Sequence, residues 1–129
     1  MLRQCSKEKK FSNGEKIFSK DEPGGEMFFI RKGQVRIMLP LSGGSAYHHI
    51  STFPKGHFFG DMAFLDNEPR SADALAEGDV EVYIISREDF NKLTSADQRL
   101  AATVFERLAY VLAVRLRHTN MEMQALEQA

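Results

Sequence analysis

Nine glycines, all of them between residues 14 and 78, divide the N-terminal part of this chain into short segments. The segments are rich in β-branched and aromatic residues, and the clearest are Met27–Ile30, Gln34–Leu39 and Val80–Ile85. Short strands that alternate with turn residues at such intervals are typical of a β-sandwich or barrel. Partial alternation of apolar and polar residues in the second and third segments indicates that one face of each is buried. A run of small residues, Ser42–Ser45, is typical of a hairpin tip.

The pattern changes from strand to helix after Ile85. Ser86 is a candidate cap for a helix that begins at Arg87, and a longer helix is expected to start near Ser95 or Ala96. The sequence therefore predicts a mainly β domain over residues 1–129, with a roll over about residues 11–86 and helices over about residues 87–127.

The long predicted helix carries a stripe of mostly apolar residues at intervals of three and four, which is the heptad spacing. A second apolar row lies beside the stripe, so the helix can pack on its own β scaffold and still offer a seam to the same helix of a second copy. A helix that lies only on its own core is the simpler interpretation, and both stay open. The stripe consists of Ala102, Phe105, Ala109, Leu112, Leu116, Thr119, Met123 and Leu126.

Composition narrows the class of protein. The 129 residues carry 17 basic and 18 acidic side chains, so the formal charge of −1 argues against direct binding of nucleic acid. The single cysteine, Cys5, cannot form an internal disulfide, which favours a reducing compartment and hence the cytoplasm. No run approaches the roughly 18 apolar residues of a membrane span.

The segment Phe58–Ala72 has the features of a phosphate site. Gly60 opens a single helical turn, and the free amides at a helix start favour an anion. Arg70 follows ten residues later and can close over the same anion with a two-pronged, charge-assisted grip. The implied ligand is a small, singly or doubly charged phosphate.

Several motifs follow one another in a familiar order: Gly14–Phe18, Gly25–Val35, Gly56–Gly60, Pro69–Ala72 and Arg87–Phe90. In order and spacing they resemble the cyclic nucleotide-binding domain, over roughly residues 11–117. The resemblance implies a jelly roll, or double-stranded β-helix, of about eight strands with flanking N- and C-terminal helices. It also implies a regulatory module and not an enzyme, with cyclic AMP or cyclic GMP as ligand. Similar domains are appended to bacterial sulfate-type transporters and to glutaminases, so a fused or docked effector is expected.

The resemblance also assigns roles by position. Gly60, Met62 and Ala63 offer backbone contacts near the ribose and phosphate, Arg70 pairs with the cyclic phosphate, and Ser71 and Ala72 complete the cradle. No metal, cofactor or catalytic residue is implied. The full set of candidate ligand-binding residues is Phe59, Gly60, Asp61, Met62, Ala63, Arg70, Ser71 and Ala72.

Four positions in or beside this segment leave alternatives open. Asp61 stands where the family usually has the glutamate that accepts from the ribose 2′-hydroxyl, and its shorter side chain is also a good helix cap. A hydroxyl residue such as Ser71 can help a syn guanine but also occurs in binders of adenine nucleotides, so the preferred nucleotide is open. Asp73 lies on the strand face opposite Ala72 and Ala74, and the sequence does not show which face lines the pocket. Arg70 itself has a simple alternative as a surface arginine.

Other functions fit this sequence to different degrees. A metal-dependent cupin is disfavoured because the adjacent His48 and His49 of a strand point to opposite faces. A scaffold that has lost nucleotide binding is compatible with Asp61. Relatives that control genes place a DNA-binding domain after the long helix, and residues 119–129 leave no room for one, so the sensor half of such a regulator is a further alternative.

Overall fold

The structure is a computed structural model that describes residues 7–42 and 46–128, the last of these by its backbone alone. The chain divides into two compact units, Met1–Phe90 and Asn91–Ala129. All the strands found among the described residues belong to the first unit. The N-terminal helix implied by the resemblance lies outside the described residues, which begin with a strand.

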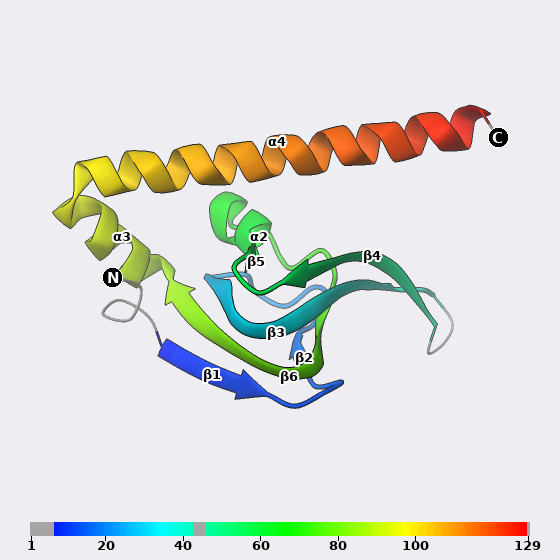
Figure 1. The fold of residues 1–129 in the computed structure, drawn as a ribbon, viewed down its shortest axis with the longest axis horizontal. Helices are drawn as coiled ribbons and strands as arrows, with labels where there is room; N and C mark the ends of the chain where they lie inside the picture. Colours follow the sequence, from blue (N-terminus) through cyan, green and yellow to red (C-terminus); the bar gives the residue numbers. More distant parts are fainter. Residues whose placement is uncertain (1–6, 43–45, 129) are drawn as a thin grey trace. The chain divides into compact units, whose positions relative to one another are not determined.

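The strands form one antiparallel six-stranded sheet in the order β1-β6-β3-β4, with β2 added to β6 and β5 added to β3. Two long curved strands, β3 and β6, run side by side and bind all the others, as Figure 1 shows. This is the mainly β roll with helices that the sequence predicted. The strands are β1 Lys7–Phe11, β2 Lys16–Phe18, β3 Glu26–Pro40, β4 Tyr47–Pro54, β5 Phe58–Phe59 and β6 Asp73–Ser86.

The described residues hold six strands and not the eight expected, because predicted breaks are bends within longer strands. The segments Met27–Ile30 and Gln34–Leu39 are both parts of β3. Gly33 between them has φ +86°, and the register with β6 shifts on both sides of Lys32. A Cβ at Gly33 would lie 2.4 Å from the carbonyl oxygen of Asp79, so only glycine lets the two strands stay paired through the bend.

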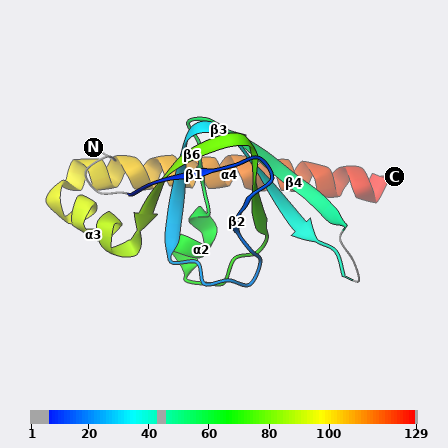
Figure 2. The same ribbon diagram turned by 90° about the horizontal axis from the view of Figure 1, so that it is seen from below.

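The predicted hairpin joins β3 to β4. Pro40 pairs with Tyr47 in antiparallel register, and the amide of Leu41 donates to the carbonyl of Ala46 at 3.0 Å. The paired strands extend together toward their tip, as Figure 2 shows. Gly43, Gly44 and Ser45 of the predicted turn lie outside the described residues.

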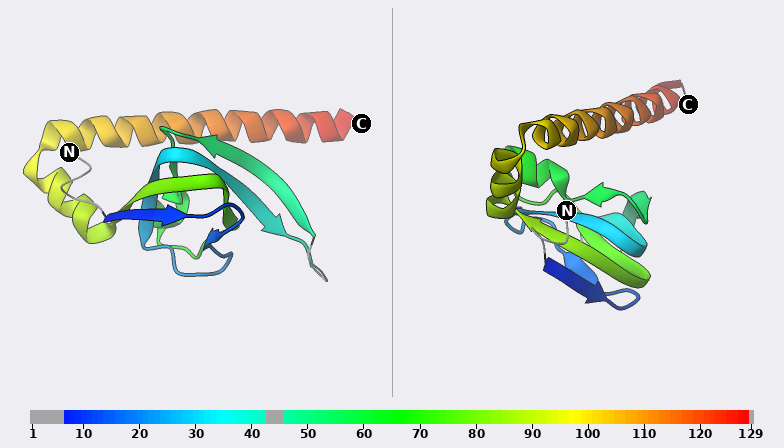
Figure 3. Two further views of the ribbon diagram at one scale, coloured as in Figure 1. Left: turned by 60° about the horizontal axis from the view of Figure 1, so that its bottom comes forward. Right: turned by 60° about the vertical axis from the view of Figure 1, so that its left-hand side comes forward.

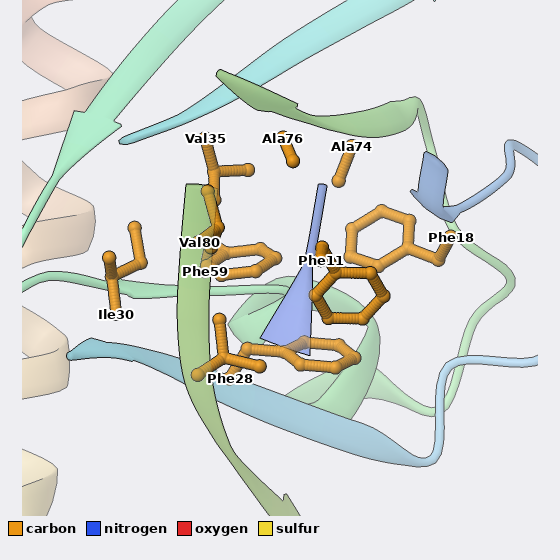
Figure 4. Packing of buried hydrophobic residues seen from close by; sticks show 10 residues of the cluster. Phe11, Phe18, Phe28, Ile30, Val35, Phe59, Ala74, Ala76 and Val80 are labelled. Atoms are coloured by element: carbon orange, nitrogen blue, oxygen red, sulfur yellow. The ribbon is translucent and has the colours of Figure 1, made fainter. Parts of the chain in front are cut away.

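Aromatic rings fill one end of the hydrophobic core. Phe28 and Phe59 stack with ring centroids 4.9 Å apart, and Phe18 lies 5.7 Å from Phe28 and 6.0 Å from Phe59. Figure 4 shows these rings converging from β2, β3 and β5, with the small side chains of Ala74 and Ala76 beside them. Alternation along the strands places these side chains on the inner face, as the sequence pattern indicated.

The helices are α2 Asp61–Asp66, α3 Arg87–Ala96 and α4 Gln98–Gln128. Ser86 caps α3 as predicted, because its Oγ accepts the amide of Asp89 at 3.0 Å. The expected start of the long helix near Ser95 or Ala96 is wrong. Asp97 caps α4 instead, accepting the amides of Arg99 and Leu100 at 3.1 Å each.

The helix α4 has 31 residues. Figure 3 shows it as one uninterrupted helix. Four large residues of the predicted stripe are exposed: Phe105 at 48%, Leu116 at 62%, Met123 at 57% and Leu126 at 76%. Among the described residues, no helix is long and apolar enough to cross a membrane.

Candidate functional site

Gly60 forms a tight corner between β5 and α2. It is the N-cap of α2, with φ +71° and ψ 10°, and its carbonyl accepts the amide of Phe64 at 3.4 Å. A Cβ at this position would lie 2.8 Å from Nη1 of Arg70, so the corner is too close to the arginine for a side chain. Asp61 is the first residue of α2 and not its cap, so the interpretation of Asp61 as the helix cap is wrong. Its side chain is only 1% exposed.

Arg70 is buried beside this corner, with 4% of its surface exposed. Its Nη1 donates to the carbonyl of Gly60 at 2.7 Å, and its Nη2 donates to the carbonyl of Glu26 at 2.6 Å. The guanidinium carbon lies 4.3 Å from the ring centroid of Phe18 and 5.5 Å from that of Phe28, within cation–π range. The alternative of a surface arginine is therefore wrong.

The electrostatics of Arg70 reflect both burial and nearby carboxylates. Burial lowers the pKa of the guanidinium below its ordinary value, and the charges of Glu26, Glu22 and Asp61 oppose this shift. Arginine nevertheless stays protonated in proteins, so the site holds a positive charge. The Nε of Arg70 is buried and has no hydrogen-bond partner. A buried donor without an acceptor costs about 1–3 kcal/mol, and an acceptor supplied by a ligand would remove this cost.

The loop between β2 and β3 holds the main chain of Arg70. The amide of Asp21 donates to the carbonyl of Arg70 at 2.8 Å, and the amide of Arg70 donates to the carbonyl of Glu22 at 2.8 Å. Further along this loop, a Cβ at Gly24 would lie 2.2 Å from that of Ala63, so the loop also lies tightly against α2. Loop, corner and arginine therefore form one packed assembly.

The other predicted site residues differ in how far they are exposed to solvent. Phe59 is fully buried in the aromatic core, whereas the side chain of Met62 is 53% exposed. Ala63 and Ala72 are buried, at 6% and 3%. Ser71 is exposed. The structure thus brings Gly60 and Arg70 into direct contact and leaves the side chains of Phe59 and Met62 in the core and at the surface.

Residues that the sequence had not marked for the site also contribute. The carbonyl of Glu26 and the rings of Phe18 and Phe28 contact the guanidinium of Arg70. The segment Gly25–Val35 had signalled the fold, but a carbonyl contact leaves no signature in residue type.

The side chain of Asp73 is 3% exposed and has partners from several segments. Its Oδ1 accepts the amide of Lys20 at 2.7 Å, and its Oδ2 accepts the hydroxyl of Tyr47 at 3.1 Å. The ammonium group of Lys16 lies 3.4 Å from the same Oδ2. The carboxylate of Asp73 is thus held by β2, the following loop and β4.

The short helix α2 also contacts the start of α3. Arg87 donates to the carbonyl of Phe64, and its guanidinium carbon lies 4.3 Å from the ring centroid of Phe64. The rings of Phe64 and Phe90 meet edge to face at 5.1 Å. The short helix that follows the glycine corner thus packs directly against the first turn of α3.

The histidines considered for a metal site do not form one. His48 and His49 are both exposed on β4, and Nε2 of His49 lies 2.7 Å from the hydroxyl of Thr52. Within the described part of the chain, no three His, Cys, Asp or Glu side chains lie close enough together to hold a metal ion.

Comparison with known proteins agrees with this architecture. Residues 8–97, more than half of the chain, match the family model described as the cyclic nucleotide-binding domain, so the fold is that of a regulatory binding domain. The chain belongs to the cyclic nucleotide-binding domain family.

Individual relatives are longer proteins. The chain is 32% identical over 116 residues to the cyclic AMP receptor protein of Thermus thermophilus. The aligned region covers 90% of this chain and 51% of that protein. It is 31% identical over 97 residues to human cGMP-dependent protein kinase 2, covering 74% of this chain and 13% of the kinase. The crystal structure of the Thermus thermophilus catabolite activator protein superposes with a TM-score of 0.83 at 29% identity, over 98% of this chain and 57% of that one. The chain thus spans about half of the first relative.

Proposed function

We propose that this domain binds cyclic AMP or cyclic GMP at the glycine corner, with Arg70 pairing with the cyclic phosphate. A cyclic nucleotide carries one negative charge on its phosphate, and the site offers one buried cation. On binding, the phosphate would lose its hydrogen bonds to water. It would accept hydrogen bonds from the fixed donors of Arg70 and from the main-chain amides of α2, Ser71 and Ala72.

The observation that carries the proposal is the buried guanidinium with an unpartnered Nε. Arginine has five N–H donors, and two hydrogen bonds to the carbonyls of Gly60 and Glu26 leave donors for an anion. A buried cation is costly to keep in an aromatic core, and a phosphate supplies both the counter-charge and the missing acceptor.

The remaining candidates have subordinate roles in this proposal. Asp61 would accept from the ribose 2′-hydroxyl, directly or through a water, from the first turn of α2. Phe59 supports the site by packing under it, and Met62 and Ala63 contribute main-chain groups.

Both cyclic nucleotides remain candidates, since one similar protein is a cyclic AMP receptor and another a cGMP-dependent kinase. Ser71 is exposed next to Arg70, where its hydroxyl can hydrogen-bond a syn guanine. We propose that this hydroxyl sets the ratio of the two affinities.

Binding is proposed to act on the C-terminal helices. A phosphate at Gly60 would bias the position of α2, and Phe64 would pass the change to Arg87 and Phe90 in α3. The shift can be no larger than the difference in nucleotide affinity between the two placements of the helices. The effector is a fused or docked enzyme or transporter, and the location is the cytoplasm.

A second candidate is the sensor half of a gene regulator. It is favoured by the similarity to a receptor protein about twice as long. In that case the exposed stripe on α4 forms a parallel seam with a second copy, in keeping with its heptad spacing.

Calorimetric titration with cyclic AMP and with cyclic GMP tests the binding proposal. At a nucleotide concentration of 100 times the dissociation constant, stability should rise by about 2.7 kcal/mol. Arg70→Met retains the bulk of the side chain and removes the charge. Its free energy of binding to the nucleotide should become less favourable by about 2–5 kcal/mol. Arg31→Met is the matched control, because Arg31 is a partly exposed arginine whose Nη1 donates to Glu8 at 2.7 Å.

If the unaltered chain gives no heat and no stabilisation with either nucleotide, the domain is a scaffold that has lost binding. If Arg70→Met binds as tightly as Arg31→Met, the site lies elsewhere.

A further inference from the structure

Asp73 is a buried carboxylate that the proposed binding reaction does not use. Burying a carboxylate is costly unless it is paired and hydrogen-bonded, and Asp73 meets this condition with the amide of Lys20, the hydroxyl of Tyr47 and the ammonium of Lys16. These partners come from a loop and two different strands. The carboxylate of Asp73 thus joins three separate segments of the chain.

The partner with the shortest bond, Lys20, belongs to the loop between β2 and β3, which bonds the main chain of Arg70. Lys20 is followed by Asp21 and Glu22, whose main-chain groups bond the carbonyl and the amide of Arg70 at 2.8 Å each. Asp21 has φ +74°, a conformation that a non-glycine residue keeps only where its surroundings hold it. The loop then reaches Glu26, whose carbonyl accepts Nη2 of Arg70.

The bond from Lys20 to Asp73 therefore closes a ring of contacts around Arg70. Two of its links, those from Asp21 and Glu22, join main-chain atoms only. The third link depends on a side chain, and it joins the loop to the first residue of β6, three positions after Arg70.

We propose that Asp73 is a positioning residue for Arg70: through the amide of Lys20 it fixes the loop between β2 and β3, and the loop fixes the guanidinium. Asp73 touches no ligand in this arrangement. Its effect on nucleotide affinity rests on the proposed function, whereas its effect on the order of Arg70 does not.

Variants on both sides of the bond separate positioning from general stability. Asp73→Ala removes the acceptor, whereas Asp73→Asn keeps an oxygen that can accept the amide of Lys20. Lys20→Pro removes the donor amide together with the lysine side chain and leaves Asp73 with Tyr47 and Lys16. Lys20→Ala is its matched control, since it removes the same side chain but keeps the amide.

Two measurements are made on the 129-residue chain. The first is hydrogen exchange of the Arg70 Nε–H by NMR without nucleotide, with the signal assigned by its loss in Arg70→Lys. The second is the dissociation constant for cyclic AMP and for cyclic GMP. In Asp73→Ala and Lys20→Pro, exchange should accelerate and affinity fall by about tenfold or more, because a buried group loses its partner. Asp73→Asn and Lys20→Ala should stay within about threefold of the parent in both measurements.

Each failure has a distinct signature. If the unaltered chain binds neither nucleotide, the proposed function fails, and the exchange measurement still decides the role of Asp73. If Lys20→Pro and Asp73→Ala lower only the melting temperature, and leave Arg70 exchange and affinity unchanged in the folded protein, Asp73 is a structural residue. Should Asp73→Ala not fold, the comparison of Lys20→Pro with Lys20→Ala decides alone.

Discussion

Substitution of Gly60 by alanine tests whether the corner and Arg70 form one unit. Gly60 has φ +71°, and Gly78 in β6 has φ +73°, so alanine meets nearly the same backbone strain at both positions. A left-handed conformation costs a non-glycine residue about 1–2 kcal/mol, and the lower entropy of the unfolded chain offsets about 0.4–1 kcal/mol of this. Gly78→Ala should therefore destabilise by roughly 1 kcal/mol or less.

The surroundings of the two glycines differ. A Cβ at Gly78 has no atom within 4 Å, whereas a Cβ at Gly60 would lie 2.8 Å from Nη1 of Arg70 and 3.1 Å from a ring carbon of Phe28. Overpacking of this kind adds typically about 1–3 kcal/mol, so Gly60→Ala should destabilise by about 1–4 kcal/mol in total. The guanidinium must also shift, so the affinity for cyclic nucleotide should fall in this variant alone.

Urea unfolding followed by far-UV circular dichroism measures the difference, since the chain has no tryptophan. Nucleotide affinity is measured by calorimetry on both variants. Equal unfolding free energies for Gly60→Ala and Gly78→Ala, together with equal affinities, would refute the close contact between corner and arginine.

Three further predictions concern specificity, assembly and coupling. Ser71→Ala should weaken cyclic GMP more than cyclic AMP, by about fivefold for one lost hydrogen bond, and an unchanged ratio of dissociation constants would exclude Ser71 as the determinant. The chain should sediment as a dimer, and the double variant Leu116→Glu with Met123→Glu should sediment as a monomer. Gln124 is exposed on the same helix, and the control Gln124→Glu should remain a dimer. A monomeric parent chain would contradict the seam. Arg87→Met should reduce the nucleotide-induced protection of α3 amides in hydrogen exchange, and full protection would mean that coupling bypasses Phe64.

The features that could be predicted from sequence depend on neighbours in the chain. Gly60 and Arg70 stand ten residues apart around one short helix, and their spacing predicted that both face one anion. In the structure Arg70 contacts the carbonyl of Gly60, and the shared anion stays a prediction. Ser86 likewise caps α3 through a residue three positions away. Lys20 and Asp73 are 53 residues apart in the chain, and Arg70 and Glu26 are 44 residues apart. Such pairs depend on the register of β3 and β6, which residue types alone do not specify.

The same reasoning explains why the limits of the strands could not be predicted from sequence. Gly33 and Gly78 have the positive φ of turn residues, yet each lies inside a strand that continues through it. A glycine pattern therefore marks where the backbone bends but not whether pairing stops, because pairing is decided by the strand alongside.

Arg70 is the residue at which local folding rules and the observed structure diverge most. Its charge is buried among phenylalanine rings, its pKa is lowered by that burial, and one of its donors has no partner. An apolar residue of similar volume would avoid these costs, since replacing buried charges by well-packed apolar groups is often neutral or stabilising. Departures of this kind are expected where a site serves a ligand more than the fold. Under the proposed function, the packed loop, the glycine corner and the carboxylate of Asp73 would keep this cation in place for an anionic ligand.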